Sequence, residues 1–411
     1  MTTFQSPLRF VSIGRRPLAP ALAIFFGAFV FACALAPRAD AKDTLVYVGG
    51  YTDWELFGPP RRNPPGERGQ GLYAFRFDLD SGRLTPLGLA AATDNPTYTA
   101  FSPDGRVLYA VNEIYRFHAA DSGAVSAFVV DAANGRLTLL NQLASRGTGP
   151  CYATVDRAGR NLLVANFGSG SVAVFPLATD GALRAMSAFE QDTGSGPSPR
   201  QAGPHAHAIN LSPDNRFAVA SEFGTDRLRV YRFDAATGAL QPADPPSVAL
   251  EPASAPRHLA FHPNGRVAYS LNEIANTLTL LDYDAARGSF RVRQSVSTLP
   301  AGFTDRNTAA EVIVHPSGKF LYASNRGDHS IAVFALAADG APKLVAHVPC
   351  GGRTPRGFAL DPTGRWMIVA HQDSHTIAVF AINPATGVPS PNGQTAPVRT
   401  PTGVKFRPLV D

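Results

Sequence analysis

One short pattern returns six times along the chain, and it limits the possible fold more than any other feature. Each copy reads apolar-x-Pro-x-Gly-Arg or a close variant, and an alternating apolar stretch follows it. Pro-Asp-Gly and its variants form turns between two apolar runs, so each copy predicts a β-hairpin. The copies occupy residues 101–106, 155–160, 211–216, 261–266, 314–319 and 360–365. Their spacing of 46 to 56 residues is typical of propellers and solenoids.

A second recurring segment fixes the number of units. It is an apolar stretch that ends in an Asp/Asn-x-x-x-Gly type turn, and there are seven copies against six hairpin motifs. The copies begin near Leu72, Val125, Val172, Leu228, Leu278, Ile331 and Ile377. Residues 402–408 resemble the start of the missing hairpin, and residues 45–49 supply its partner strand. We therefore predict an all-β, seven-bladed β-propeller, whose ring is closed by N- and C-terminal strands that share one blade.

The first 41 residues are predicted to be an export signal peptide. Arg9, Arg15 and Arg16 give a positive start, an apolar run spans residues 22–35, and residues 39–41 (Ala-Asp-Ala) fit the small-x-small cleavage rule. The apolar run of 14 residues is short for the roughly 20 that span a bilayer, although an uncleaved anchor is the alternative. We expect a periplasmic or secreted protein without stable membrane insertion after cleavage.

The remaining chain, residues 42–411, is predicted to be a single propeller domain of nearly balanced charge. The formal net charge is +5, but the leader holds four Arg against Asp40, which leaves 33 basic and 31 acidic residues. No long Lys/Arg run and no interleaving of aromatic and basic residues occur, so nucleic acid is not an expected partner. A closed ring has no free strand edge, and we therefore expect a monomer.

The geometry of a hairpin brings two positions of every repeat to one face of the ring. The start of its first strand and the end of its second strand are neighbours in an antiparallel pair. Four residues before the hairpin motifs lie Thr97, Cys151, His207, Arg257, Ala310, Arg356 and Thr402; twelve residues after their first residue lie Glu113, Phe167, Phe223, Glu273, Arg326 and Gln372, with Tyr51 in the shared blade.

Residues that recur at equivalent positions serve the blades, whereas residues that differ indicate a site. The exceptions are His207, Arg257, Glu273, Arg326, Arg356, Glu113 and Glu222, with Glu311 one residue away from the first position. A concave mouth with a few convergent polar groups is the usual place for a small ligand. We therefore expect these side chains to surround one mouth of the ring.

The residue types at this mouth suit acid–base chemistry on an ester. A His works as a base or an acid near neutral pH, and two Arg can hold an oxyanion, a carboxylate or a phosphate. The chain has no Gly-x-Ser-x-Gly elbow that would supply a nucleophile. His205 and His207 permit a metal, but no further ligand has typical zinc spacing, so neither a metal nor another cofactor is expected.

Several short stretches resemble those of the seven-bladed propeller lactonases of the 6-phosphogluconolactonase type and, more distantly, the fungal carboxy-muconate cycloisomerases. They are Gly-Pro-His-Ala-His at 203–207, Pro-Arg-His at 256–258, Leu-Asn-Glu at 271–273, Ala-Glu-Val at 310–312 and Ser-Asn-Arg at 324–326. The resemblance covers residues 43–408. In the cycloisomerase branch, a His, two Arg and a Glu form the active site, which implies catalytic roles for His207, Arg257, Glu273 and Arg326.

The resemblance implies hydrolysis of a sugar lactone, with a small-molecule lactone as the partner. Around the catalytic residues we expect five substrate-binding residues: His205, Glu113, Glu222, Glu311 and Arg356. Which of His205 and His207 acts stays open. A phosphorylated lactone is scarce outside the cytoplasm, so the leader favours an unphosphorylated aldonolactone. The alternatives are a lactonising cycloisomerase and a non-catalytic binding propeller.

Overall fold

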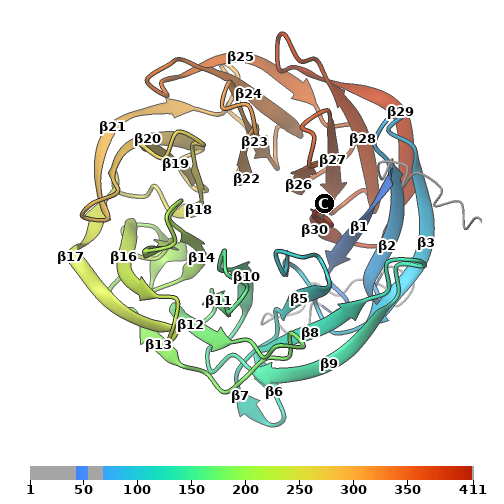
Figure 1. The fold of residues 1–411 in the computed structure, drawn as a ribbon. Coiled ribbons are helices and arrows are strands. Elements are labelled where there is room, and N and C mark those ends of the chain that lie inside the picture. The colour runs from blue at the N-terminus through green and yellow to red at the C-terminus, as the bar shows by residue number, and fades with distance from the viewer. Residues whose placement is uncertain (1–42, 54–67, 410–411) are drawn as a thin grey trace, which may run out of the picture. The chain divides into compact units, whose positions relative to one another are not determined.

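The computed structural model describes residues 43–53 and 68–409. Seven four-stranded sheets follow one another along these residues and stand in a ring around a common axis (Figure 1). They belong to one compact unit. The predicted all-β, seven-bladed propeller is confirmed. No helix in this part of the chain is long and apolar enough to cross a membrane, and the predicted leader at 1–41 lies outside the described residues.

The blades are antiparallel, and each begins with a strand beside the axis. From the axis outward, the first blade contains β30 (Pro401–Phe406), β1 (Asp43–Gly50), β2 (Gly71–Asp78) and β3 (Leu84–Ala92). The second contains β4 (Thr99–Phe101), β5 (Val107–Asn112), β8 (Ala124–Val130) and β9 (Leu137–Ala144). The third contains β10 (Pro150–Val155), β11 (Asn161–Asn166), β12 (Ser171–Pro176) and β13 (Ala188–Gln191).

The remaining blades keep the same order. The fourth contains β14 (Ala206–Leu211), β15 (Phe217–Glu222), β16 (Arg227–Asp234) and β17 (Ala239–Ala249), and the fifth β18 (Pro256–Phe261), β19 (Val267–Asn272), β20 (Thr277–Asp284) and β21 (Ser289–Ser297). The sixth contains β22 (Ala309–Val314), β23 (Phe320–Asn325), β24 (Ser330–Leu336) and β25 (Pro342–Pro349), and the seventh β26 (Pro355–Leu360), β27 (Trp366–His371), β28 (Thr376–Ile382) and β29 (Pro389–Pro397). A short hairpin, β6 (Arg116–Phe117) and β7 (Ala120–Asp121), stands apart.

The two ends of the chain close the ring in one sheet. β30 pairs antiparallel with β1, with Val46 opposite Phe406 and Val48 opposite Val404. The side chains of Val404 and Phe406 are buried in the cluster between the first and seventh blades. The predicted shared blade is therefore confirmed, and apolar packing reinforces its hydrogen bonds.

The second strands of the blades explain the long apolar runs of the sequence. Every residue of β5, β11, β15, β19 and β23 is buried. Neighbouring blades cover both faces of these strands, so apolar and polar residues do not alternate along them. The outermost strands face solvent, and in β3 most residues are exposed or partly exposed.

The repeated hairpin motif forms its turn through a left-handed residue. In the fifth blade this residue is Gly265 with a φ of 67°, and the fourth blade has Asn215 with a φ of 63°. Glycine adopts this conformation freely, and asparagine tolerates it better than most residues. This is why the third copy of the motif keeps its turn without glycine.

Candidate active site

A β-bulge in the strand beside the axis aims the predicted site residues. In β14, pairing passes from Ala206 directly to Ala208, so His207 is left out of the ladder. β18 skips Arg257 in the same way. A bulge bends the strand and re-aims the side chain of the extra residue. The same shift falls at Cys151, Arg356 and Thr402. The position four residues before each hairpin motif, where the residue type differs between blades, is thus the bulged position in these blades.

Arg257 connects the predicted catalytic residues. Its Nη1 donates to Nε2 of His207 and, over 2.8 Å, to Oε2 of Glu273. Its Nε donates to the carbonyl oxygen of Ala310 over 2.7 Å. Arg326 joins the same carboxylate, with Nη2 at 2.8 Å from Oε2 of Glu273. The structure therefore brings together the four residues that were predicted to be catalytic.

Glu273 is an anion held by three guanidinium groups. Arg200 pairs with Oε1, while Arg257 and Arg326 share Oε2. Burial alone raises the pKa of the Glu273 carboxyl, but Arg326, Arg257 and Arg200 outweigh burial and hold this pKa well below its usual value. Glu273 thus stays ionised at neutral pH, and its main effect is to orient the guanidinium groups.

His207 is neutral in this arrangement. Burial, followed by the charge of Arg257, lowers the pKa of the imidazole well below its usual value. A guanidinium group can only donate, so Nε2 of His207 must be the acceptor and Nδ1 must carry the proton. Nδ1 lies 3.5 Å from Sγ of Cys151. The lone pair of His207 is therefore occupied by Arg257, and the ring becomes a base only when Arg257 releases it.

Glu113 and Arg356 form a second group at the axis. The hydroxyl of Tyr51 donates to the Glu113 carboxylate over 3.3 Å, and the guanidinium of Arg356 lies 5.3 Å from the centre of the Tyr51 ring. Burial raises the pKa of Glu113, although Arg356 opposes this effect. The raised pKa favours the protonated form of this carboxyl more than in water.

The mouth pocket is the accessible part of this arrangement. It is a cavity of about 470 Å³, lined by Glu273, Arg326 and Arg356 together with Arg200, Arg306, Asn307, Thr308, Gly327, Thr354, Gln372 and Asp373. His207 and Arg257 do not line it; both are buried behind Glu273, with exposures of 4%. The guanidinium groups of Arg200, Arg257, Arg326 and Arg356 exceed the nearby carboxylates in number. The pocket therefore suits an anionic group or a developing oxyanion.

Arg200 and Arg306 were missed in the reading of the sequence. Both lie in the two longest connections between blades, residues 192–205 and 298–308. Arg200 belongs to the 3-10 helix η3 (Pro199–Gln201), whose capping box uses Ser198 and Gln201. The unusual length of these connections was a visible signal, because loops placed on a rigid scaffold often carry binding residues.

His205 and Glu222 have mainly structural contacts. Nδ1 of His205 lies 2.8 Å from the carbonyl oxygen of Phe167, and its ring stacks on the Phe167 ring with centres 4.7 Å apart. The carboxylate of Glu222 accepts from the main-chain amides of His205 and Gly224. Burial raises the pKa of Glu222 to about 7. Of the two histidines, only His207 contacts Arg257.

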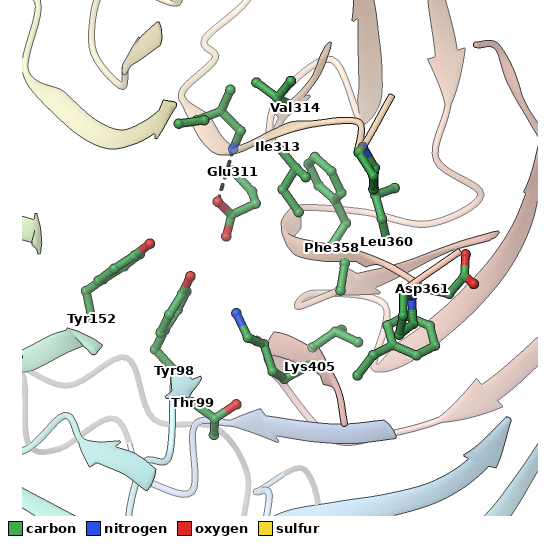
Figure 2. Close-up of a pocket in the computed structure, with 18 of the residues that line it drawn as sticks. Tyr98, Thr99, Tyr152, Glu311, Ile313, Val314, Phe358, Leu360, Asp361 and Lys405 are labelled. Carbon is green, nitrogen blue, oxygen red and sulfur yellow. Dashed lines mark hydrogen bonds between the residues drawn. The ribbon is translucent and has the colours of Figure 1, made fainter. Parts of the chain in front are cut away.

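Glu311 lies at a different level from the mouth pocket. In β22 pairing passes from Ala309 to Val312 while β23 passes from Asn325 to Ala323, so this blade also carries one extra residue. Glu311 lies one residue after the position that Arg257 has in β18, and it therefore corresponds to His258. Glu311 pairs with His258, its Oε1 lying 2.7 Å from Nδ1, and lines a pocket with Tyr98, Tyr152 and Lys405 (Figure 2). Lining residues from the hairpin turns, such as Pro316, place this pocket toward the opposite end of the blades.

Comparisons with known proteins connect this fold and site to one family. The family model described as "Lactonase, 7-bladed beta-propeller" matches residues 45–406. A 6-phosphogluconolactonase of Bacillus subtilis is 36% identical over 71% of this chain and 81% of its own length. A 6-phosphogluconolactonase of Formosa agariphila is 31% identical over 77% of this chain and 86% of its own length.

A solved structure extends the comparison to three dimensions. The periplasmic gluconolactonase of Pseudomonas aeruginosa superposes with a TM-score of 0.81 at 33% identity, over 90% of this chain and all of its own. The relatives described here carry lactonase names, and they do not support the more distant resemblance to the muconate cycloisomerases.

Proposed function

Because this chain belongs to the seven-bladed β-propeller lactonase family, we propose that it hydrolyses an aldonolactone at the mouth pocket. One observation carries the proposal. Arg257 contacts both His207 and Glu273 directly behind a pocket with an excess of guanidinium groups. Ester hydrolysis needs positive groups where negative charge develops and a base for water, and these residues supply both.

The reaction begins with water attacking the carbonyl carbon of the lactone. Negative charge forms on the carbonyl oxygen, where the guanidinium groups of Arg326 and Arg257 stabilise it. As Arg257 turns toward that oxygen, Nε2 of His207 becomes free to take a proton from the water. The ring C–O bond then breaks, and the proton passes to the departing ring oxygen. One water is consumed and one hydroxy acid is formed.

The remaining predicted residues bind and position the substrate in this proposal. Arg356 and Arg200 line the pocket and can hold substrate oxygens, while Glu113 supplies a buried carboxyl nearby. Glu273 is a positioning residue, because it fixes three guanidinium groups. Glu222 and His205 shape the turns at the edge of the site, and their contribution to substrate binding stays a prediction.

The proposed substrate is an unphosphorylated sugar lactone. Support comes from the predicted export signal and from the likeness to a periplasmic gluconolactonase. The positive pocket also has the charge for a phosphorylated lactone, and two relatives are named 6-phosphogluconolactonases. We propose a periplasmic or secreted monomer that needs neither a metal nor an organic cofactor.

Acid release from a panel of lactones tests the proposal. The purified protein is incubated with glucono-δ-lactone, 6-phosphogluconolactone and a small aliphatic lactone, and spontaneous hydrolysis is subtracted. We expect glucono-δ-lactone to be the best substrate and turnover to disappear in His207→Ala and Arg257→Ala. Arg266→Ala, on an exposed hairpin turn, is the matched control. Rates equal to the blank with every lactone would favour a non-catalytic binding propeller.

A further inference from the structure

Four polar side chains from four blades converge on the axis beyond His207, away from the mouth pocket. They are Tyr98, Tyr152, Glu311 and Lys405, and Figure 2 shows their polar ends directed toward the same space. We call this cavity of about 470 Å³ the hairpin-side pocket, because Pro316 and Pro362 of the hairpin turns also line it. Its size is typical of small-molecule sites.

The hairpin-side pocket is separate from the proposed active site. No residue lines both cavities. Between the residues of the two cavities, the rings of His207 and His258 meet edge to face, with ring centres 5.4 Å apart. His207 is bonded to Arg257 on one side, and His258 is bonded to Glu311 on the other. A ligand in one pocket therefore contacts different residues from a ligand in the other.

Lys405 is a cation without an anionic partner in contact. Within the described part of the chain, its Nζ makes no hydrogen bond or ion pair, and it lies 5.8 Å from the centre of the Tyr98 ring. Burial lowers the pKa of Lys405, although the Glu311 carboxylate opposes this effect. Lys405 is partly buried and lines the cavity, so an anion bound there would contact its ammonium group directly.

Glu311 offers an acceptor on the other side of the space. Its Oε1 lies 2.7 Å from Nδ1 of His258 and accepts a hydrogen bond from the Val312 amide over 3.0 Å. Its Oε2 has no hydrogen-bond partner among the described residues. The hydroxyl of Tyr152 accepts from Nδ2 of Asn210 over 2.8 Å. The pocket thus presents one free cation, one free carboxylate oxygen and phenol hydroxyls.

We propose that the hairpin-side pocket binds a small hydroxylated monocarboxylate. Its carboxylate would pair with Lys405, and its hydroxyls would donate to Oε2 of Glu311 and bond to the tyrosines. A neutral polyol would bind less well, because it leaves the Lys405 ammonium unpaired. An acid without hydroxyls would also bind less well, because it offers no donor to Oε2 of Glu311 and brings a like charge close to it. A phosphate dianion meets a single cation and the repulsion of Glu311. The ligand is either an external hydroxy acid or the hydroxy acid that lactone hydrolysis produces.

Equilibrium calorimetry with gluconate tests this proposal on the purified full chain. We expect Lys405→Met to weaken this binding about 10- to 100-fold, since a charge-assisted hydrogen bond is lost. Lys343→Met, at an exposed position of an outer strand, is the matched control and should bind as the wild type does. Sorbitol and acetate should each bind at least about tenfold more weakly than gluconate. Equal binding of gluconate by Lys405→Met and wild type, or equal binding of sorbitol, overturns the proposal.

Two further arms separate the possible sites and sources. Arg326→Met removes a guanidinium of the mouth pocket, and the Lys405-dependent binding should survive in it. Tyr98→Phe keeps the shape of the hairpin-side pocket, removes one hydroxyl and should weaken binding even if Lys405→Met folds poorly. Preference for gluconate over lactate assigns the reaction product as ligand, and the reverse assigns an external acid. An active lactonase without Lys405-dependent binding would overturn this proposal and leave the proposed lactonase function intact.

Discussion

Arg257 donates a hydrogen bond to Nε2 of His207, and this contact decides which ring nitrogen of the histidine carries the proton. The same guanidinium also binds Glu273, so the position of Arg257 determines both the charge of the pocket and the availability of the histidine base. In the described conformation the base is occupied. Substrate binding would have to draw Arg257 away for His207 to act.

The pKa of His207 should depend on Arg257. Burial and the Arg257 charge lower it, so the neutral ring persists to a pH well below the usual value of 6.5. Arg257→Met removes the second of these causes, and the His207 titration should move to higher pH. Histidine ring signals followed by NMR against pH measure this shift, with His207→Asn used for assignment. An unchanged titration in Arg257→Met, alongside the control Arg266→Met, would refute this electrostatic account.

Replacing Glu273 by Gln should destabilise the protein. The change leaves three guanidinium groups without their shared anion, and breaking a buried ion pair costs about 3–5 kcal/mol. The folded-state pKa of Glu273 is depressed, so the wild type has this extra stability above the unfolded pKa and loses it as the pH falls through the folded pKa. Urea unfolding at pH 7 and at low pH checks both points. The exposed Glu251→Gln should show neither effect.

Arg200 should contribute to turnover although it lies on a loop. Arg200→Ala removes one of the guanidinium groups that pair with Glu273, and it removes a positive charge from the pocket lining. The Arg200 side chain is 45% exposed, however. Solvent screening reduces the effect, and we expect kcat/KM for the lactone to fall about tenfold. Steady-state kinetics with Arg184→Ala as the exposed control measures the change. A value within twofold of the wild type would mean that Arg200 has no part in the reaction.

The closing strand should carry a large share of the stability. Phe406 is 7% exposed and meets Phe77 edge to face, with ring centres 5.3 Å apart. Phe406→Ala should lower the free energy of unfolding by about 3–5 kcal/mol, through lost burial and a new cavity. Leu409→Ala, three residues further on and 43% exposed, should have almost no effect. Chemical denaturation of both variants compares them directly, and similar losses would contradict the role of β30 in ring closure.

Both described cysteines should resist alkylation in the folded protein. Cys151 and Cys350 are free and buried, and burial raises the pKa of Cys151 and that of Cys350, the latter to about 11. Since the thiolate is the reactive form, iodoacetamide at pH 8 should modify each at least about tenfold faster after unfolding in urea. Peptide mapping by mass spectrometry reports the two sites separately. Rapid labelling of Cys151 in the native state would show that the axis opens on the timescale of the reaction.

The sequence alone was sufficient to predict the architecture, because the signals that define it are local. Each Pro-x-Gly turn specifies its own hairpin, and the seven apolar segments count the blades. The partial motif at residues 402–408 predicted the closing strand that pairs with β1. The same local register brought His207, Arg257, Glu273 and Arg326 together, since equivalent positions of equivalent blades face the same axis.

Only the tertiary structure decided how these side chains contact one another. Glu311 lies one residue after the position of His207 and Arg257 in their blades, and only the packed blades show that this step directs it to a different pocket. Arg200 reaches Glu273 from a connection that belongs to no repeat. The tautomer of His207 depends on a guanidinium from the next blade. Turns and apolar runs are determined by neighbours in the chain, whereas contacts across the axis depend on how separate blades are packed.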